Sequence, residues 1–185
     1  MSRILDPIIL DFDTSVFFDV KWKDYRCSCI QHQKTEQSDL HPENKMPECL
    51  VLDNTAIHQK FFDDDEVDYN LLSQRTGIDV KSVSVIMQEP GNIIPIHRDM
   101  FHMIKSNYDT EGKQIVRANI FLEDWKSGHY LEFDKDPCTN WKANEGFVIS
   151  EEVTHLSANA GLENKYTVQI SGFYNDNKIH ESPRQ

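Results

Sequence analysis

Short runs of β-forming residues, separated by turn residues, fill the second half of this 185-residue chain and most restrict its fold. From residue 82 onward these runs follow one another without an intervening helical segment of about 10–15 residues. The expected strands are Ser82–Met87, Ile93–Arg98, Ile115–Leu122, Tyr130–Phe133, Gly146–Ser150 and Lys165–Ser171. This pattern favours an antiparallel sandwich or barrel over a Rossmann-like sheet, in which helices alternate with strands.

Turn residues separate these strands. Glu89–Asn92, with the sequence Glu-Pro-Gly-Asn, is a strong turn signal, and a second turn is expected near Lys126–Gly128. The dipeptide Asp136-Pro137 predicts a break in the chain between two strands.

The first 80 residues show a mixture of helix, strand and loop signals. Asp13–Ser15 are suited to cap a short segment that runs through Phe18, and Glu66–Arg75 is expected to form a helix that stops at Gly77. Gln31–Glu48 is almost entirely polar and predicts a long loop, either mobile or acting as a lid over a site.

The length fits a single domain, since domains span roughly 100–200 residues. We expect residues 1–80 to form mixed α/β support, residues 81–174 to form the β-rich core and residues 175–185 to form a fraying tail.

Composition disfavours several classes of protein. The chain has 19 Lys and Arg against 31 Asp and Glu, a formal charge of −12, and no basic patch that could attract nucleic acid. No apolar run approaches the ~20 residues that span a membrane, and Pro7–Leu10 is too short for the core of a secretory signal. We therefore expect a cytoplasmic protein with neither nucleic acid nor membrane as partner. The four cysteines, which form no Cys-x-x-Cys pair, are expected to be free thiols (Cys27, Cys29, Cys49 and Cys138).

Three potential metal ligands lie in the β-rich half. His97 and Asp99 are two residues apart in an expected strand, so their side chains point to the same face, and His155 follows later. Two imidazoles and one carboxylate form the facial triad of non-haem Fe(II) oxygenases, which leaves metal positions open for a cosubstrate and dioxygen.

Other interpretations of this pattern exist. A His-x-Asp pair also occurs by chance as an exposed ion pair. The sequence His97-Arg98-Asp99 also matches the protein-kinase catalytic loop, but no glycine-rich loop precedes it and no Asp-Phe-Gly follows, which excludes a kinase.

A cation and a hydroxyl follow the second histidine at a short spacing. Lys165 lies ten residues after His155, and Thr167 shares its face of the expected strand. Such a pair suits the distal carboxylate of a small diacid, through one charge-assisted and one neutral hydrogen bond. The alternative is an exposed lysine on an edge strand.

Six segments together resemble a known family. They are Pro90–Asp99, Arg117–Leu122, Gly128–Phe133, Thr154–His155, Asn159–Gly161 and Lys165–Gly172. Over Ser82–Gly172, half of the chain, the sequence is similar to the Fe(II)/2-oxoglutarate-dependent oxygenases. The resemblance implies a mainly β fold with flanking helices (α+β), built on a double-stranded β-helix, the cupin-like jelly roll.

The resemblance also implies an activity and the residues that perform it. Fe(II) is expected on His97, Asp99 and His155, and the 2-oxoglutarate C5 carboxylate on Lys165 and Thr167. With O2, such an enzyme converts 2-oxoglutarate to succinate and CO2 and hydroxylates a C–H bond, here preferably on a protein or peptide side chain such as Pro, Asn or Asp.

Arg117 has two possible orientations. It shares a strand face with Asn119, so it either points inward as a second carboxylate contact or outward as a surface arginine. Among the remaining candidates, His102 and Tyr108 are placed to line the mouth of the site.

The branch of the family stays open. A lysine ten residues after the second histidine is similar to the prolyl-4-hydroxylase pattern. The Arg-x-Asn-Ile-Phe-Leu strand leans towards the aspartyl/asparaginyl β-hydroxylases, whose members often lack the metal carboxylate that Asp99 provides.

Three further alternatives remain at this point. The first is hydroxylation of a free amino acid or another small molecule. The second is a cupin-like metal-binding protein that does not use 2-oxoglutarate. The third is a non-catalytic β-sandwich binding module.

His129 is expected at the surface or behind the metal ligands, and Trp125 and Trp141 are expected to pack in the core.

Overall fold

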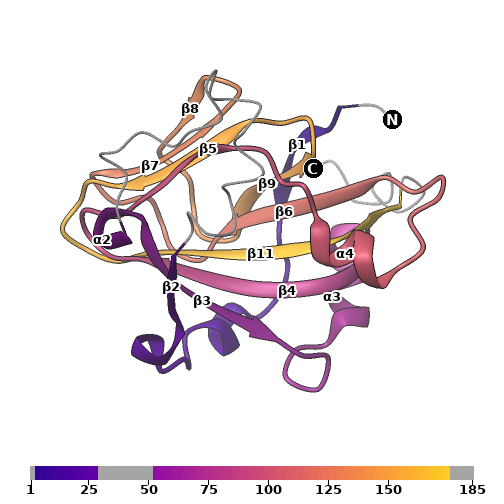
Figure 1. Cartoon of the computed structure of the whole chain (residues 1–185). Helices are drawn as coiled ribbons and strands as arrows, with labels where there is room; N and C mark the ends of the chain where they lie inside the picture. The colour runs from indigo at the N-terminus through magenta and orange to yellow at the C-terminus, as the bar shows by residue number, and fades with distance from the viewer. Residues whose placement is uncertain (1–2, 29–51, 176–185) are drawn as a thin grey trace.

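A computed structural model describes residues 3–28 and 52–175 (Figure 1). The expected loop Gln31–Glu48 and the tail beyond residue 175 lie outside the described residues. Within the described ranges, no helix has both the length and the apolar character needed to cross a membrane.

Two antiparallel sheets form the body of the protein (Figure 1). The larger sheet has seven strands, in the order β1 (Leu5–Ile9), β9 (Glu145–Ser150), β6 (Ile115–Phe121), β11 (Lys165–Tyr174), β4 (Ile78–Gln88), β3 (Ala56–Phe62) and β2 (Arg26–Ser28). The smaller sheet has four strands, in the order β5 (Ile93–His97), β10 (His155–Asn159), β7 (His129–Phe133) and β8 (Asp136–Cys138). This arrangement is a double-stranded β-helix, so the mainly β jelly roll expected from the sequence is confirmed.

Short helices flank the sheets. They are the 3₁₀ helices η1 (Thr14–Phe17) and η2 (Trp22–Tyr25) and the α-helices α2 (Leu52–Thr55), α3 (Tyr69–Thr76) and α4 (His102–Asn107). The Asp13 carboxylate accepts a hydrogen bond from the Ser15 backbone N–H and begins η1, as its position in the sequence predicted.

The predicted helix at residues 66–75 starts later than expected. Asp68 caps α3 by accepting a hydrogen bond from the Leu71 N–H at 2.8 Å, so the helix begins at Tyr69. It stops where predicted, at Gly77, whose φ of 69° suits a residue without Cβ.

All six predicted strands are present, but the predicted break at Asp136-Pro137 is wrong. These residues belong to β8, and the turn lies just before them at Asp134 and Lys135, whose φ angles are 48° and 78°. Two positive φ angles in a two-residue loop are typical of a hairpin turn. Strand β8 tolerates Pro137 because it lies at the edge of the smaller sheet, where a missing N–H donor removes little pairing.

The two faces of the larger sheet differ in character. Apolar side chains from its central strands form one face and pack against Phe17, Phe62 and Leu72. They include Val83, Val85, Ala118, Ile120, Val168 and Ile170. Polar side chains of the same strands point to the opposite face and line a cavity. The main apolar core therefore lies outside the jelly roll, where η1 and α3 cover the sheet (Figure 1).

Gly146 is required for close approach of β9 to β6. A Cβ atom at this position would lie 2.1 Å from the Asn119 carbonyl oxygen, a backbone atom that cannot move aside. We expect Gly146→Ala to lower the free energy of unfolding by roughly 2 kcal/mol or more, in the range of overpacked core sites. Urea unfolding measures this loss.

Gly112→Asn is the matched control, because Gly112 has a φ of 69° and open space within 4 Å of the position that a Cβ would take, and Asn tolerates that conformation. Equal losses at the two positions would contradict the assigned steric role of Gly146.

Candidate metal centre

Antiparallel pairing of β5 with β10 places two histidines side by side. His97 ends β5, His155 begins β10, and the two residues are direct partners in the register. Their ring centroids lie 4.1 Å apart. Asp99 lies two residues beyond the end of β5, outside the strand that the sequence predicted to contain it. One ligand atom from each of the three residues lies within 4.8 Å of the others, and all three residues are buried.

The histidine rings present their Nε2 atoms to Asp99. His97 Nδ1 donates to the Pro95 carbonyl at 2.8 Å, and His155 Nδ1 donates to the Val153 carbonyl at 3.3 Å. The proton therefore lies on Nδ1, and the Nε2 lone pairs of His97 and His155 lie 3.9 and 3.8 Å from the Asp99 carboxylate oxygens. A backbone carbonyl that orients the far ring nitrogen is typical of metal-binding histidines.

Burial keeps both rings neutral. Removal from water lowers the pKa of His97 to about 3, and the neighbouring His155 adds to this effect. Burial likewise lowers the pKa of His155. Neutral imidazoles are the form that binds a metal ion.

The Asp99 carboxylate has one engaged and one open oxygen. Oδ1 accepts a hydrogen bond from Arg117 Nη1 at 2.6 Å, whereas Oδ2 is buried without a hydrogen-bond partner in the described part of the chain. Burial alone raises the pKa of Asp99, but the Arg117 guanidinium and the two imidazoles outweigh it and hold the pKa below its usual value. A buried, ionised oxygen that faces two imidazole lone pairs fits a divalent cation.

The Arg117 side chain points into the cavity, the inward of its two possible orientations. Its Nη1 contacts Asp99, its Nε donates to Ser171 Oγ at 2.9 Å, and its guanidinium carbon lies 5.4 Å from the centre of the Phe101 ring. In this structure Arg117 therefore holds the candidate metal carboxylate, and it also lines the cavity.

A cavity of about 400 Å³ opens beside the three candidate ligands. Its other lining side chains come from β3, β4, β6, β11, α4 and Phe101 just before α4, with single contributions from β5, β7 and β10. His102 lines this cavity, as predicted for the mouth of the site. Tyr108 does not line it and packs edge-on against Phe173 instead.

Lys165 and Thr167 point to the same face of β11, but they differ in their relation to the cavity. Thr167 lines the cavity, whereas Lys165 lies behind Gln88 and Ser157, which line it. The Lys165 ammonium donates to Gln88 Oε1 at 3.2 Å, to the Tyr130 carbonyl at 3.1 Å and to Ser157 Oγ.

The surroundings of the Lys165 ammonium are unusual for a lysine. The side chain is 2% exposed, and the three acceptors of its hydrogen bonds are all neutral. Burial therefore lowers the pKa of Lys165 to about 7. A buried cation held only by neutral groups favours a site that receives an anion.

The remaining candidates have structural roles. His129 is buried rather than exposed, and its Nε2 lies 3.1 Å from the Glu163 carbonyl, apart from the metal ligands. Trp141 stacks on Phe121 with 3.9 Å between ring centroids, and Trp125 packs against the same apolar cluster, as predicted.

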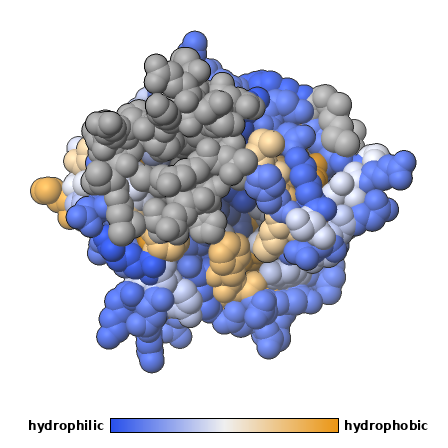
Figure 2. Space-filling model, viewed as in Figure 1, coloured by the Kyte–Doolittle hydropathy of each residue, from blue (hydrophilic) through white to orange (hydrophobic). Residues whose placement is uncertain are grey.

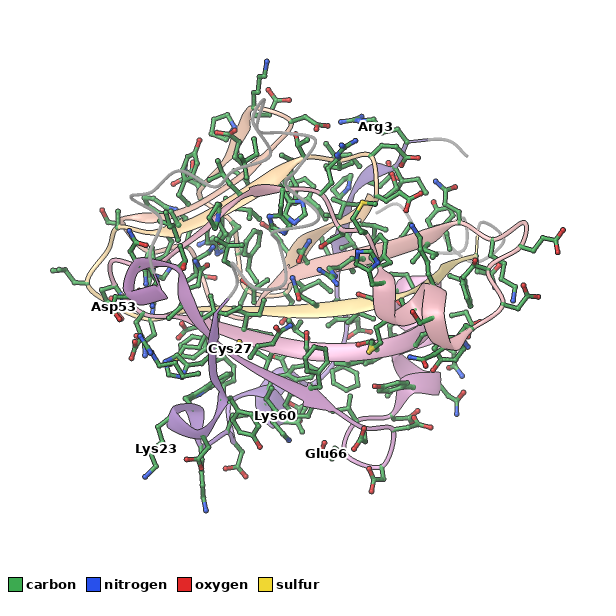
Figure 3. The ribbon with its side chains drawn as sticks, viewed as in Figure 1. Arg3, Lys23, Cys27, Asp53, Lys60 and Glu66 are labelled. Carbon is green, nitrogen blue, oxygen red and sulfur yellow. The ribbon has the colours of Figure 1, made fainter. Side chains whose placement is uncertain are left out.

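The described cysteines take no part in the cavity. Cys27 on β2, at the edge of the larger sheet (Figure 3), and Cys138 on β8 are both free thiols, as predicted. Burial raises the pKa of both thiols, which keeps them protonated and weakly reactive. Cys29 and Cys49 lie outside the described residues.

Sequence reasoning missed several polar residues that line the cavity. They are Gln59, Ser82, Ser84, Gln88, Ser157, Gln169 and Ser171. The available signal was the polar residues at alternate positions of β4 and β11, interrupted on β4 only by Ile86, which differ from the apolar alternation of a strand facing a dry core.

Fold and site together define a double-stranded β-helix with a buried cluster of two histidines and one carboxylate. A prolyl-4-hydroxylase from Pseudomonas putida is similar in structure, with a TM-score of 0.52 and 13% sequence identity over 94% of both chains. This similarity, which spans nearly the whole of each chain, supports a fold of the cupin and 2-oxoglutarate-oxygenase type.

Two partial matches have lower scores. A viral collagen prolyl hydroxylase from Paramecium bursaria Chlorella virus-1, in a 2-oxoglutarate complex, has a TM-score of 0.43 and 16% identity, over 63% of this chain and 78% of that one. A predicted oxalate decarboxylase from Thermotoga maritima also scores 0.43, with 9% identity, over 64% of this chain and 81% of that one. No protein-family model and no curated protein sequence matches the chain.

We expect His97→Ala and Asp99→Ala each to weaken binding of Co²⁺ by more than about a hundredfold. Each substitution removes one of three protein ligands, and loss of a supporting group alone typically costs 10–100-fold. Titration calorimetry and the visible absorbance of Co²⁺ measure this change.

His102→Ala is the control, because His102 lines the same cavity without joining the cluster. Its Co²⁺ affinity should stay within about twofold of the wild type, because the substitution leaves all three clustered residues in place. Equal weakening by all three substitutions would mean that the cluster does not bind the ion.

Proposed function

We propose that this protein is an Fe(II)/2-oxoglutarate-dependent oxygenase that hydroxylates a C–H bond. The observation that carries the proposal is the buried convergence of His97, Asp99 and His155, with two Nε2 lone pairs and one carboxylate oxygen left open. Lys165, a buried lysine on β11 without an acidic partner in its hydrogen bonds, contacts Ser157 on β10, two residues after His155, and adds support.

His97 Nε2, His155 Nε2 and Asp99 Oδ2 are the atoms that would hold the iron. The chemistry that Fe(II) supplies when bound is the activation of O2 that couples decarboxylation of 2-oxoglutarate, to succinate and CO2, to hydroxylation of the substrate. Arg117 keeps Asp99 ionised and leaves only Oδ2 free, so the carboxylate offers a single oxygen to the ion.

Lys165 is the proposed anchor for the distal carboxylate of 2-oxoglutarate. Ser157 accepts a hydrogen bond from Lys165 and lies two residues after His155, and such residues on one strand face are about 6.6 Å apart. A five-carbon diacid bound at the iron by its keto acid end therefore has its other carboxylate close to Lys165. The ammonium would exchange Gln88 or Ser157 for this carboxylate, with the Thr167 hydroxyl as a second donor.

A protein or peptide side chain is the proposed substrate. Phe61 and Met103 both line the cavity, and they are 55% and 47% exposed. Figure 2 shows a small group of hydrophobic residues on a mostly hydrophilic face. Exposed apolar side chains at the cavity rim suit a substrate that extends beyond the cavity, as a peptide does and a free amino acid does not.

A second candidate is a cupin-like metal enzyme that does not use 2-oxoglutarate. It is favoured by one observation, that Lys165 lies behind Gln88 and Ser157 rather than in the cavity lining. Activity without 2-oxoglutarate would support this candidate.

The direct test is anaerobic loading of the protein with Fe(II), followed by addition of 2-oxoglutarate and air-saturated buffer. We expect 2-oxoglutarate binding to give the visible absorbance of a chelated Fe(II), and succinate to form in excess of the enzyme. His97→Ala protein, treated identically, should give neither signal. Wild-type protein that binds Fe(II) but neither binds nor consumes 2-oxoglutarate would overturn the proposal.

The affinity for 2-oxoglutarate should fall as pH rises above about 7. The pKa of Lys165 is about 7 in the free protein, and a bound carboxylate raises it, so binding requires the protonated amine. The loss approaches tenfold per pH unit. Two other titratable groups interact with Lys165, namely His129 and Cys138. Burial lowers the pKa of His129 and raises the pKa of Cys138, so both groups stay uncharged as the pH rises above 7.

Lys165→Met is the matched variant, because Met fills the same space without a charge. Its 2-oxoglutarate affinity should be low and independent of pH, while its Co²⁺ affinity stays near that of the wild type. A wild-type affinity that does not change across this pH range would show that Lys165 does not receive the carboxylate.

A further inference from the structure

Most edge strands of the two sheets contain a proline. The larger sheet ends in β1 and β2, and the smaller sheet ends in β5 and β8. Pro7 lies in β1, Pro95 in β5 and Pro137 in β8. A proline has no N–H to donate to a strand that is added at an edge. Strand β2 has no proline, but it is only three residues long, so the edge beside β2 is the exception.

Because β2 is short, it leaves part of β3 uncovered. It pairs with residues 56–58, whereas β3 continues to Phe62 and stays paired with β4 on its other side. Among the described strands, none lies along the outer side of residues 59–62, and Figure 1 shows this part of β3 at the border of the larger sheet. The stretch contains no proline, so it is an edge that can accept another strand.

One hydrogen bond shows which backbone groups face this edge. The Gln59 N–H donates to the Cys27 thiol on β2, so Gln59 turns its backbone groups away from β4. In an antiparallel ladder, every second residue turns its N–H and C=O to the same side. Phe61 therefore also directs both groups to the open side, where β2 no longer reaches. The Gln59 carbonyl and the Phe61 N–H and carbonyl are thus available to an added strand.

The same edge borders the cavity. Ile57, Gln59 and Phe61 line the cavity from β3, and Phe61 is 55% exposed. Directly paired residues of an antiparallel pair point to the same face. A strand that pairs with Gln59 and Phe61 would therefore direct alternate side chains to the cavity side of the sheet. Lys60 points to the opposite face and pairs with Glu66 (Figure 3), so it does not obstruct this side.

Charge beside this edge favours a basic partner. The turn that follows β3 holds Asp63, Asp64, Asp65 and Glu66, all of them exposed. Glu66 pairs with Lys60, whereas the three aspartates form no ion pair within residues 3–28 and 52–175. In an antiparallel arrangement, the N-terminal part of an added strand lies beside this turn, because β3 runs towards it. A cationic side chain in that part would be attracted to the aspartates.

We propose that the open edge of β3 is the docking site of the substrate. An extended polypeptide segment pairs antiparallel with residues 59–62 and directs alternate side chains to the cavity, one of which reaches the candidate metal centre. A lysine or arginine in the N-terminal part of the segment lies beside Asp63–Asp65. This inference rests on the proposed oxygenase function, because it assigns how the substrate of the same site is held. Recognition then depends on the backbone of the segment and on one cation, in addition to the side chain that enters the cavity.

The test begins with a phage-displayed library of short random peptides, selected on Zn²⁺-loaded protein with 2-oxoglutarate. The selected sequences should contain Lys or Arg in their N-terminal half. The tightest binder is then synthesised with an N-methyl group at each amide in turn. We expect two positions, separated by one tolerant residue, to lose at least about tenfold in affinity, because their N–H groups donate to the Gln59 and Phe61 carbonyls. The amide between them points away from β3 and should lose less than about twofold.

Amide hydrogen exchange locates the peptide on the protein. Binding should slow exchange of the Phe61 N–H at least about tenfold, whereas the Lys60 N–H, which faces β4, should change little. Phe61→Pro removes the Phe61 N–H and should still fold, because this N–H does not pair with β4. Its peptide affinity should be at least about tenfold below that of Phe61→Ala, which keeps the N–H and loses only the ring. If Phe61→Pro does not fold, the N-methyl series and the exchange of the wild-type protein decide.

Charge reversal tests the cationic contact. Asp65→Lys should weaken binding of the selected peptide roughly fivefold. Asp136→Lys is the matched control, because Asp136 is exposed on β8, at the edge of the smaller sheet opposite β5, and this variant should keep the wild-type affinity. Equal weakening by the two substitutions would refute the contact with the turn after β3.

The exchange data also distinguish other occupants of this edge. Protection of the Phe61 amide without peptide would overturn the proposal. Protection that grows with protein concentration would assign the edge to a second copy of the chain, and protection at every concentration would assign it to a segment of the same chain. No peptide binding, binding without the alternating N-methyl pattern, or a Phe61 amide that stays unprotected in the complex would also overturn the proposal.

The same experiments separate this inference from the proposed function. Protein that converts 2-oxoglutarate to succinate but pairs no peptide at β3 would refute the docking site and leave the oxygenase proposal intact. Protein that pairs the peptide at β3 but neither binds nor consumes 2-oxoglutarate would refute the oxygenase proposal alone.

Discussion

The ion pair between Arg117 and Asp99 joins the two sheets at the point where the candidate chemistry occurs. Arg117 belongs to β6 of the larger sheet, and Asp99 follows β5 of the smaller one. Asp99 lies two residues beyond the end of β5, outside the paired part of the strand. The Arg117 guanidinium therefore sets the position and the charge of the Asp99 carboxylate. The two histidines need no such support, because the direct pairing of β5 with β10 aligns them. The strand pairing thus positions His97 and His155, whereas Arg117 of the opposite sheet positions the Asp99 carboxylate beside them.

The distribution of apolar side chains explains how the interior of the roll can be polar. Most of the burial that stabilises the fold occurs on the outer face of the larger sheet, where Phe17, Phe62 and Leu72 of the N-terminal part cover it. The inner face of the larger sheet therefore does not have to form the apolar core of the protein. Hydroxyl and amide groups can occupy it at little cost to the main apolar cluster, which leaves room for recognition of a polar molecule.

Sequence reasoning located six of the strands and the His97–Asp99 pair because both depend on local patterns. It named His155 as the third candidate ligand without its strand β10, and it did not specify β1, β2, β3 or β8. Alternation and turn residues mark strands, and the His-x-Asp spacing survives although Asp99 lies outside its strand. The position of the Lys165 ammonium behind Gln88 was beyond prediction, because three neighbouring strands determine it. The alignment of Ser84, Gln169 and Asn119 across three strands was missed for the same reason. The sequence of one strand does not reveal its register with the neighbouring strands. Strand β8 was missed because proline usually ends a strand, and its edge position only becomes visible in the assembled sheet.

The placement of Pro137 also affects how copies of this protein behave towards one another. Strand β8 is one of the two edge strands of the smaller sheet, and an open edge of this kind can recruit a strand from another molecule. Proline offers no N–H to such a strand, and the tight hairpin before it keeps the edge only three residues long. The β8 edge of the sheet that carries both histidines is thus protected from intermolecular extension, which would otherwise lead to aggregation at high concentration.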